Sequence, residues 1–286
     1  MSLVEKILKG ERAAIAKAIT LVESSREKDK KESKELISRL ILSPGHSVRV
    51  GFSGSPGVGK STFIESFGSY LVGKGYKLGI LAIDPSSQLT GGSILGDKTR
   101  MSVISKNENT FIRSTPSRGS LGGVSFGTRE AAIILDSAGY DFVFIETVGV
   151  GQSEIMAANL VDIFSLIVGP GSGDELQGIK KGITEYADIF IVNKADGDLK
   201  LQASKTASDY QSSLNYLSTS EASINKKVLL VSSLEQTGMN DVTVTIQEII
   251  SSNKKSGLFE KRRSNQLAYW IKEEVRKNIQ HKVEIE

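Results

Sequence analysis

Apolar and polar positions change their spacing along the chain, and the first part of it reads as helical. Residues 3–23 carry apolar side chains at three- and four-residue intervals, the spacing of an amphipathic helix. A second helix is expected over Glu35–Leu42, before the helix-breaking Ser43–Gly45, and the charged run Arg26–Lys34 between the two is interpreted as an exposed turn. We therefore expect a helical N-terminal extension over residues 1–46.

From residue 47 to residue 253, short apolar runs alternate with amphipathic segments. Most of the runs are continuous Ile, Val, Leu and Phe, as in strands buried on both faces of a parallel sheet. Strands are expected at residues 48–52, 78–83, 110–112, 142–146, 163–168, 189–192 and 228–231. The pattern predicts an α/β fold with a mainly parallel sheet flanked by helices, in which ligands bind at the carboxyl ends of the strands.

The composition changes again in residues 254–286, which predict a helical C-terminal arm. An apolar stripe in helical register runs along this arm and consists of Leu267, Trp270, Ile271, Val275 and Ile279. Such a stripe has to be covered by the chain itself or by a second subunit. Trp270 is interpreted as a packing residue, and the basic cluster at residues 261–263 as solvated surface.

The segment Gly54–Ser61, G-S-P-G-V-G-K-S, follows the first expected strand and opens a helical segment. It matches G-x-x-x-x-G-K-[ST], in which backbone N–H groups surround phosphate oxygens, the lysine reaches the outer phosphates and the hydroxyl meets Mg²⁺. The helix N-terminus behind it favours negative charge. The motif predicts a P-loop NTPase domain over residues 47–253, with nucleotide bound by Gly54, Ser55, Pro56, Gly57, Val58, Gly59, Lys60, Ser61 and Thr62. Lys60 is also a catalytic candidate.

Acidic residues follow two further strands. Asp84 and Asp97 come after the second strand, and Glu146 closes the strand at 142–146. Because Mg²⁺ prefers hard oxygen ligands, Asp84 and Asp97 are both candidates for coordinating it or for positioning water, although each aspartate alone fits a helix cap or turn equally well. Glu146 is a catalytic candidate. Gly149, three positions later, is expected to sense the γ-phosphate, because its backbone N–H can approach only where no side chain intervenes.

The sequence N-K-A-D at residues 193–196 selects the nucleotide base. A carboxylate at Asp196 can accept from both the ring N1–H and the 2-amino group of guanine. Adenine offers neither donor, so an ATP complex would leave this carboxylate unpaired at a cost of about 1–3 kcal/mol. GTP is therefore favoured over ATP. The expected base-binding residues are Asn193, Lys194, Asp196, Ser232, Ser233 and Leu234.

Composition narrows the class of protein further. The 286 residues contain 36 Lys and Arg against 33 Asp and Glu, for a net charge of +3, which makes no case for nucleic-acid binding. Cysteine is absent and there are only two histidines, so disulfides, thiolate metal sites and His-rich metal sites are excluded. No apolar run has the length of a membrane span, and no signal-peptide layout opens the chain. We expect a cytoplasmic protein, or one of the mitochondrial matrix in a mature organellar form.

Several motifs, in this order, resemble the MeaB/ArgK family. They are the phosphate loop, D-P-S-S at 84–87, the glycine-rich segments at 91–101 and 116–123, E-T-V-G-V-G-Q-S-E at 146–154, G-D-E-L-Q-G-I-K-K-G at 173–182 and N-K-A-D. The resemblance implies a G protein that acts as a chaperone of adenosylcobalamin-dependent methylmalonyl-CoA mutase or a related acyl-CoA mutase. It also implies a homodimer built through the terminal helices and bound GTP or GDP, with Mg²⁺ held around Ser61, Asp84, Asp97 and Glu146. Switch loops are implied near residues 84–100, 146–154 and 171–182.

The leading mechanistic hypothesis is GTP hydrolysis by positioning and charge stabilisation. Gln152 is the candidate for positioning the attacking water, but it lies three residues after Gly149 rather than next to it. Slow intrinsic turnover, accelerated by a partner, is therefore expected. Two alternatives stay open: an adaptor that uses bound nucleotide structurally, and an ATP-dependent small-molecule kinase or transport-associated ATPase.

Overall fold

A single parallel sheet organises the protein. The computed structural model describes residues 1–24, 26–84, 101–116, 126–147, 152–171, 181–217 and 226–283. Within them the sheet comprises β1 (Val48–Ser53), β2 (Leu78–Asp84), β3 (Thr110–Pro116), β4 (Phe142–Glu146), β5 (Ile163–Val168), β6 (Ile189–Val192) and β7 (Lys227–Leu230). Every pairing between neighbouring strands is parallel. This confirms the expected fold class, and the expected strands agree with the observed ones to within a few residues.

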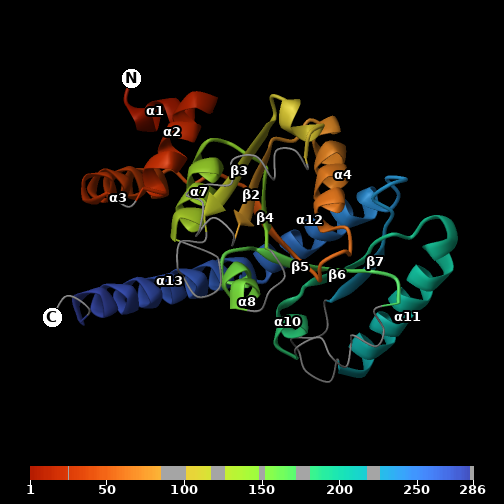
Figure 1. Cartoon of the computed structure of the whole chain (residues 1–286). Coiled ribbons are helices and arrows are strands. Elements are labelled where there is room, and N and C mark those ends of the chain that lie inside the picture. The colour runs from red at the N-terminus through yellow and green to blue at the C-terminus, as the bar shows by residue number, and fades with distance from the viewer. Residues whose placement is uncertain are drawn as a thin grey trace.

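Strand β1 lies at the centre, in the order β3-β2-β4-β1-β5-β6-β7. The chain moves outward from β1 to β2 and β3 on one side and continues with β5, β6 and β7 on the other (Figure 1). In an open parallel sheet, the point where the strand order reverses is where ligands bind, outside the carboxyl ends of the strands. Phe52 near the end of β1 is paired with Glu146 at the end of β4, so the segments that leave these strands start side by side.

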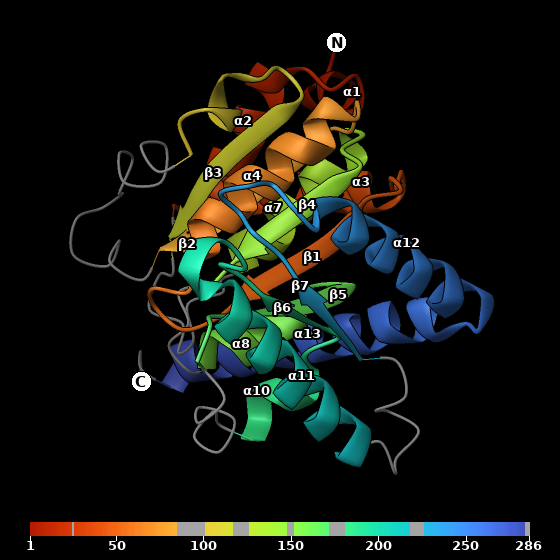
Figure 2. The ribbon, with the colours of Figure 1, turned by 90° about the vertical axis from the view of Figure 1, so that its right-hand side faces the viewer.

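Helices cover both faces of the sheet. One face carries α4 (Lys60–Gly73) and α12 (Met239–Lys255), which lie in front of the strands in Figure 2. The opposite face packs against α7 (Phe126–Ser137), α8 (Gln152–Ala158), α10 (Lys181–Tyr186), α11 (Lys200–Leu217) and α13 (Leu258–Val283). Two short 3₁₀ helices, η1 (Ile104–Lys106) and η2 (Gly197–Leu199), complete these layers. Among the described helices, none combines the length and apolarity needed to cross a bilayer.

Aromatic packing fixes α4 against the strands that end at the site. The rings of Phe52 and Phe144 are 4.9 Å apart, and Phe67 stacks on Phe144 at 5.5 Å. Phe63, one turn before Phe67, lies 5.6 Å from Phe52. All four side chains are fully buried. The start of α4 is therefore held rigidly over the carboxyl ends of β1 and β4.

The N-terminal extension differs from the sequence expectation in two ways. The single helix expected over residues 3–23 is two helices, α1 (Leu3–Leu8) and α2 (Arg12–Val22), separated at Gly10, whose φ of 74° is unfavourable for other residues. The charged run expected to be a turn belongs instead to α3 (Glu27–Ile41). Its helix is stabilised by the buried Leu36, Ile37 and Leu40, while most of its charged side chains lie on the exposed face.

The interpretation of the basic cluster at residues 261–263 as solvated surface holds for the exposed Lys261 and is wrong for the two arginines. Arg262 forms an ion pair with Asp188 at 3.1 Å, and Arg263 one with Asp162 at 2.8 Å. The side chain of Asp162 is only 1% exposed. The acidic partners precede β6 and β5 and are far from the arginines in sequence, so only the folded chain brings the pairs together. These contacts fix the first turns of α13 to the amino-terminal edge of the sheet.

Candidate nucleotide-binding site

The predicted phosphate loop occupies the junction between β1 and α4. The structure places Gly54, Ser55, Pro56, Gly57, Val58 and Gly59 between these elements, and Lys60, Ser61 and Thr62 in the first turn of α4. A Cβ on Gly54 would lie 2.2 Å from the carbonyl oxygen of Ile167 on β5. Gly59 has a φ of 91°, and its Cβ would lie 2.7 Å from Nδ2 of Asn193. Both positions therefore require glycine for the loop to pack this closely.

Lys60 extends along the inside of the phosphate loop. Its Nζ donates to the carbonyl oxygen of Gly54 at 2.6 Å. Burial lowers the pKa of Lys60, and the carboxylates of Glu146 and Glu154 act in the opposite direction. A partly desolvated ammonium group framed by backbone N–H groups of a helix N-terminus is suited to hold the outer phosphates of a nucleotide.

Two of the predicted metal ligands lie next to each other. Oγ of Ser61 donates to Oε1 of Glu146 at 2.9 Å, across the gap between α4 and the end of β4. A hydroxyl and a carboxylate together are hard oxygen ligands of the kind that Mg²⁺ prefers, so this pair fits a magnesium ion that takes its remaining ligands from water and phosphate. The described residues contain no group of three or more acidic or histidine side chains that could hold a metal without such help.

Of four other predicted site residues, two are placed by their backbone alone and two are not described. Asp84 is the last residue of β2, and Ala82 of this strand pairs with Glu146, but its side chain lies outside the described part of the chain. Asp97 and Gly149 lie outside the described residues altogether. Gln152 is the first residue of α8, with its side chain again outside the description. Their roles in metal and γ-phosphate binding stay predictions.

The predicted base-binding motif is joined directly to the phosphate loop. Nδ2 of Asn193 donates to the carbonyl oxygen of Val58 at 3.1 Å, while its Oδ1 accepts from the N–H and hydroxyl of Ser233 at 3.2 and 2.7 Å. Nζ of Lys194 donates to the carbonyl oxygen of Gly57 at 2.6 Å. One buried amide therefore holds together three loops that are distant in sequence, and the structure unites the predicted phosphate and base residues in one site.

The carboxylate of Asp196 is oriented by a buried hydroxyl. Oγ of Ser232 donates to Oδ2 of Asp196 and accepts from the N–H of Glu235 at 3.0 Å. Ser232 is fully buried, so this serine is fixed within its turn. Leu234, in contrast, exposes 76% of its surface, so its predicted contact with a base would involve the backbone. The arrangement presents a held carboxylate beside the phosphate loop, as recognition of the guanine N1–H and 2-amino donors requires.

Sequence reasoning did not assign a role to Ser53 or Glu154. Oγ of Ser53, the residue before Gly54, donates to Oε1 of Glu154 at 2.7 Å, and both residues are buried. Within the described residues, Oε2 of Glu154 has no hydrogen-bond partner. The only available signals were a hydroxyl residue directly before the phosphate loop and an acidic residue in the first turn of the helix that follows Gly149.

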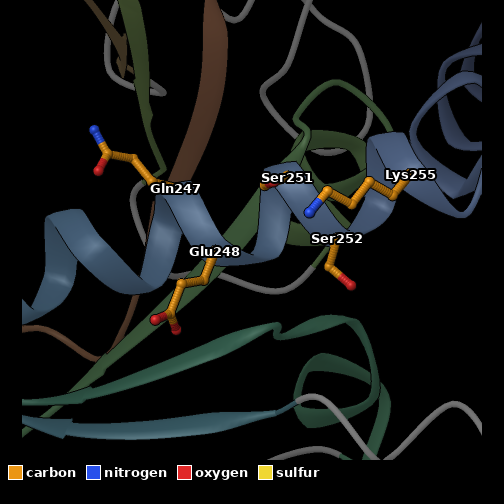
Figure 3. Close-up of a pocket in the computed structure, with 5 residues that line it drawn as sticks. All are labelled: Gln247, Glu248, Ser251, Ser252 and Lys255. Carbon is orange, nitrogen blue, oxygen red and sulfur yellow. The ribbon is translucent and has the colours of Figure 1, made fainter.

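One hollow on the described surface lies on α12, away from this site. It has a volume of about 450 Å³ and is lined by residues of α12 alone, namely Gln247, Glu248, Ser251, Ser252 and Lys255. Figure 3 shows that Gln247 and Glu248 point to opposite sides of the helix rather than toward a common centre. A depression along one helix without convergent polar groups lacks the features of a ligand site.

Comparison with known proteins agrees with this site. Residues 15–286 match the protein family described as methylmalonyl Co-A mutase-associated GTPase MeaB. GTPase ArgK of Escherichia coli (strain K12) is 41% identical over 276 residues, which cover 96% of this chain and 83% of that protein. The mitochondrial methylmalonic aciduria type A homolog of Mus musculus is 41% identical over 283 residues, covering 96% of this chain and 68% of that protein.

The fold is also that of a solved structure. The crystal structure described as LAO/AO transport system kinase is 34% identical, with a TM-score of 0.81, and the match covers 97% of this chain and 83% of that one. The similarity therefore extends over the sheet and both sets of terminal helices, well beyond the phosphate loop.

Proposed function

Because the chain belongs to the MeaB family of methylmalonyl-CoA mutase-associated GTPases, we propose that it is a G-protein chaperone of an adenosylcobalamin-dependent acyl-CoA mutase, methylmalonyl-CoA mutase first of all. In this role it gates cofactor loading and protects the mutase from inactivation. The observation that carries the nucleotide part of the proposal is Asn193, whose buried amide joins the phosphate loop to the base-binding turn. GTP hydrolysis is the proposed reaction.

The proposed substrate contacts follow from the site. Backbone N–H groups at residues 57–60 and the ammonium group of Lys60 bind the phosphates, where they stabilise the charge that develops in the transition state. Asp196, held by Ser232, accepts from the guanine N1–H and 2-amino group. The stem of Lys194 covers the base face while its ammonium group stays on the loop carbonyl of Gly57.

Magnesium is the proposed cofactor. Ser61 and Glu146, which share a hydrogen bond, would hold it together with Asp84 and Asp97. The ion supplies neutralisation of phosphate charge when it is bound. In the proposal Gly149 senses the γ-phosphate and Gln152 orients water. Because Gln152 is displaced from the usual place next to the glycine, turnover is slow until a partner completes the site.

A second copy of the chain is the proposed partner of the C-terminal arm. Apolar side chains on α13 expose about half of their surface: Leu267 49%, Ile271 54%, Val275 53% and Ile279 58%. A continuous apolar stripe of this kind on a terminal helix is the signature of an interaction surface. The proposed units are residues 1–46, 47–253 and 254–286, and the last boundary falls within the final turn of α12. Ultracentrifugation of the full chain and of Ile271→Glu tests the dimer, which the variant should dissociate.

The deciding experiment measures GTP turnover with and without a purified adenosylcobalamin-dependent methylmalonyl-CoA mutase. Slow turnover alone and acceleration by the mutase are expected, and Lys60→Ala should abolish both. Fast turnover by the protein alone would contradict the switch mechanism. If the protein is an adaptor, the Lys60→Ala variant should still affect the mutase. If it is a kinase, it should bind ATP more tightly than GTP, and Asp196→Ala should not change that preference. A pull-down from the native host that retains a mutase subunit would identify the partner. Fractionation into cytoplasm or mitochondrial matrix would identify the compartment.

A further inference from the structure

A buried carboxylate lies beside the start of the phosphate loop. Glu154 is 4% exposed, and its Oε1 accepts from Oγ of Ser53, the last residue of β1, at 2.7 Å. Helix α8, which carries Glu154, packs against β1 and β5. The contact therefore places the carboxylate at the point where the chain leaves β1 and enters the loop at Gly54.

The second oxygen of this carboxylate makes no contact that would explain its burial. Among the described residues, Oε2 of Glu154 is buried without a hydrogen-bond partner. Burying a carboxylate whose charge is not compensated costs free energy of folding. Because the fold gains no hydrogen bond from Oε2, its burial points to a role for the negative charge itself.

The charge of Glu154 acts on the lysine of the phosphate loop. Nζ of Lys60 donates to the carbonyl oxygen of Gly54 at 2.6 Å, and Gly54 directly follows Ser53. Burial lowers the pKa of Lys60, and the carboxylates of Glu146 and Glu154 raise it. The ammonium group therefore lies within the electric field of both carboxylates.

The two carboxylates differ in what can offset their charge. Glu146 accepts from Ser61 and is a proposed magnesium ligand, so a bound cation would offset its charge. Glu154 is held by the hydroxyl of Ser53, which is neutral and leaves the charge uncompensated. A negative charge at this place opposes phosphate binding in two ways, because it attracts the ammonium group that phosphate has to engage and it repels phosphate itself.

We propose that Glu154 is a positioning residue of the phosphate site, and that its buried negative charge weakens nucleotide binding and so speeds the release of GDP. The inference rests on the proposed function, in which Lys60 binds the phosphates. GDP and GTP are both affected, so the charge does not select one over the other. A buried charge acts mainly on the rate of dissociation, because the steering of an approaching ligand depends on charges at the surface.

The test removes the charge and keeps the size of the side chain. Glu154→Gln retains an oxygen that can accept from Ser53, and Glu154→Met introduces an apolar group of similar size, a change that buried sites often tolerate. In both variants we expect the Kd for GDP and for a non-hydrolysable GTP analogue to fall about three- to tenfold. The dissociation rate of GDP should fall by a similar factor. The control Glu248→Gln removes the same charge from an exposed position of α12 and should match wild type.

The direction of the change separates a role of the charge from a merely structural role. A structural role for Glu154 predicts weaker binding by both variants, and weaker or unchanged binding would overturn the inference. Ser53→Ala keeps the charge and removes the hydrogen bond, so it should not tighten binding. If it tightened binding as much as Glu154→Gln, the effect would belong to the position of α8, and the inference would again be overturned.

The same measurements distinguish this inference from the proposed function. Absence of GTP and GDP binding by the wild type would refute the proposed function itself. Normal binding by the wild type, with an unchanged Kd in both Glu154 variants, would refute this inference alone.

Discussion

Replacing Asn193 by alanine should destabilise the protein even when no nucleotide is added. The side chain is 1% exposed and connects three separate loops through its amide. Alanine removes the donor that satisfies the carbonyl of Val58 and the acceptor that satisfies the N–H and hydroxyl of Ser233. The hydroxyl can rotate toward another acceptor, but the two backbone groups cannot move without disturbing the phosphate loop or the base-binding turn.

The magnitude follows from these two backbone groups. A buried polar group left without a partner costs about 1–3 kcal/mol, so two of them predict a loss near 3 kcal/mol in the free energy of unfolding. This corresponds to a ratio of folded to unfolded protein lowered by about a hundredfold. Ser233→Ala removes only the hydroxyl bond, at 2.7 Å, and should cost about 1 kcal/mol.

Urea unfolding of the two single variants and the double variant measures both quantities. Because the residues share a hydrogen bond, their effects should not add, and the double variant should be about 1 kcal/mol more stable than the sum predicts. Asn253→Ala, at a partly exposed position of α12, is the control and should change stability by less than about 0.5 kcal/mol. An Asn193→Ala loss below 1 kcal/mol, or strict additivity, would refute the bridging role assigned to this amide.

Three further predictions concern the site and its support. Ser232→Ala frees the carboxylate of Asp196, so the preference for GTP over ATP in competition binding should fall by about tenfold; an unchanged preference would contradict the orienting role. Phe67→Ala empties a fully buried position of α4 and should cost about 3–5 kcal/mol in urea unfolding, far more than a surface alanine substitution. Arg263→Met leaves the buried carboxylate of Asp162 without its ion pair and should cost about 3–5 kcal/mol, part of which Asp162→Asn should restore. Failure of that second change to restore stability would assign the loss to packing.

The fold class and the residues of the candidate site were predictable from local sequence. A continuous apolar run predicts a buried strand whichever neighbours it acquires, and this placed all strands from β1 to β7. Phosphate and base motifs need a particular backbone and side chain within a few residues, so Gly54–Ser61 and Asn193–Asp196 could be recognised before any contact was known. The prediction from local sequence was wrong in α3, where a charged run had indicated a turn. The run is helical because Leu36, Ile37 and Leu40 of the same helix are buried.

Contacts between distant residues were decided by the tertiary structure alone. Ser53 contacts Glu154, and Arg263 contacts Asp162, although about a hundred residues separate the members of each pair. Sequence spacing could not predict these contacts, because only the order of the strands brings the residues together. The same holds for Trp270. The sequence predicted a packing residue, but it could not predict that the indole N–H donates to the carbonyl oxygen of Asn159. By itself the sequence predicted which groups would bind phosphate and guanine, since that chemistry is local. The folded sheet and its helices decided how those groups are held, since burial and hydrogen bonding depend on neighbours that only folding supplies.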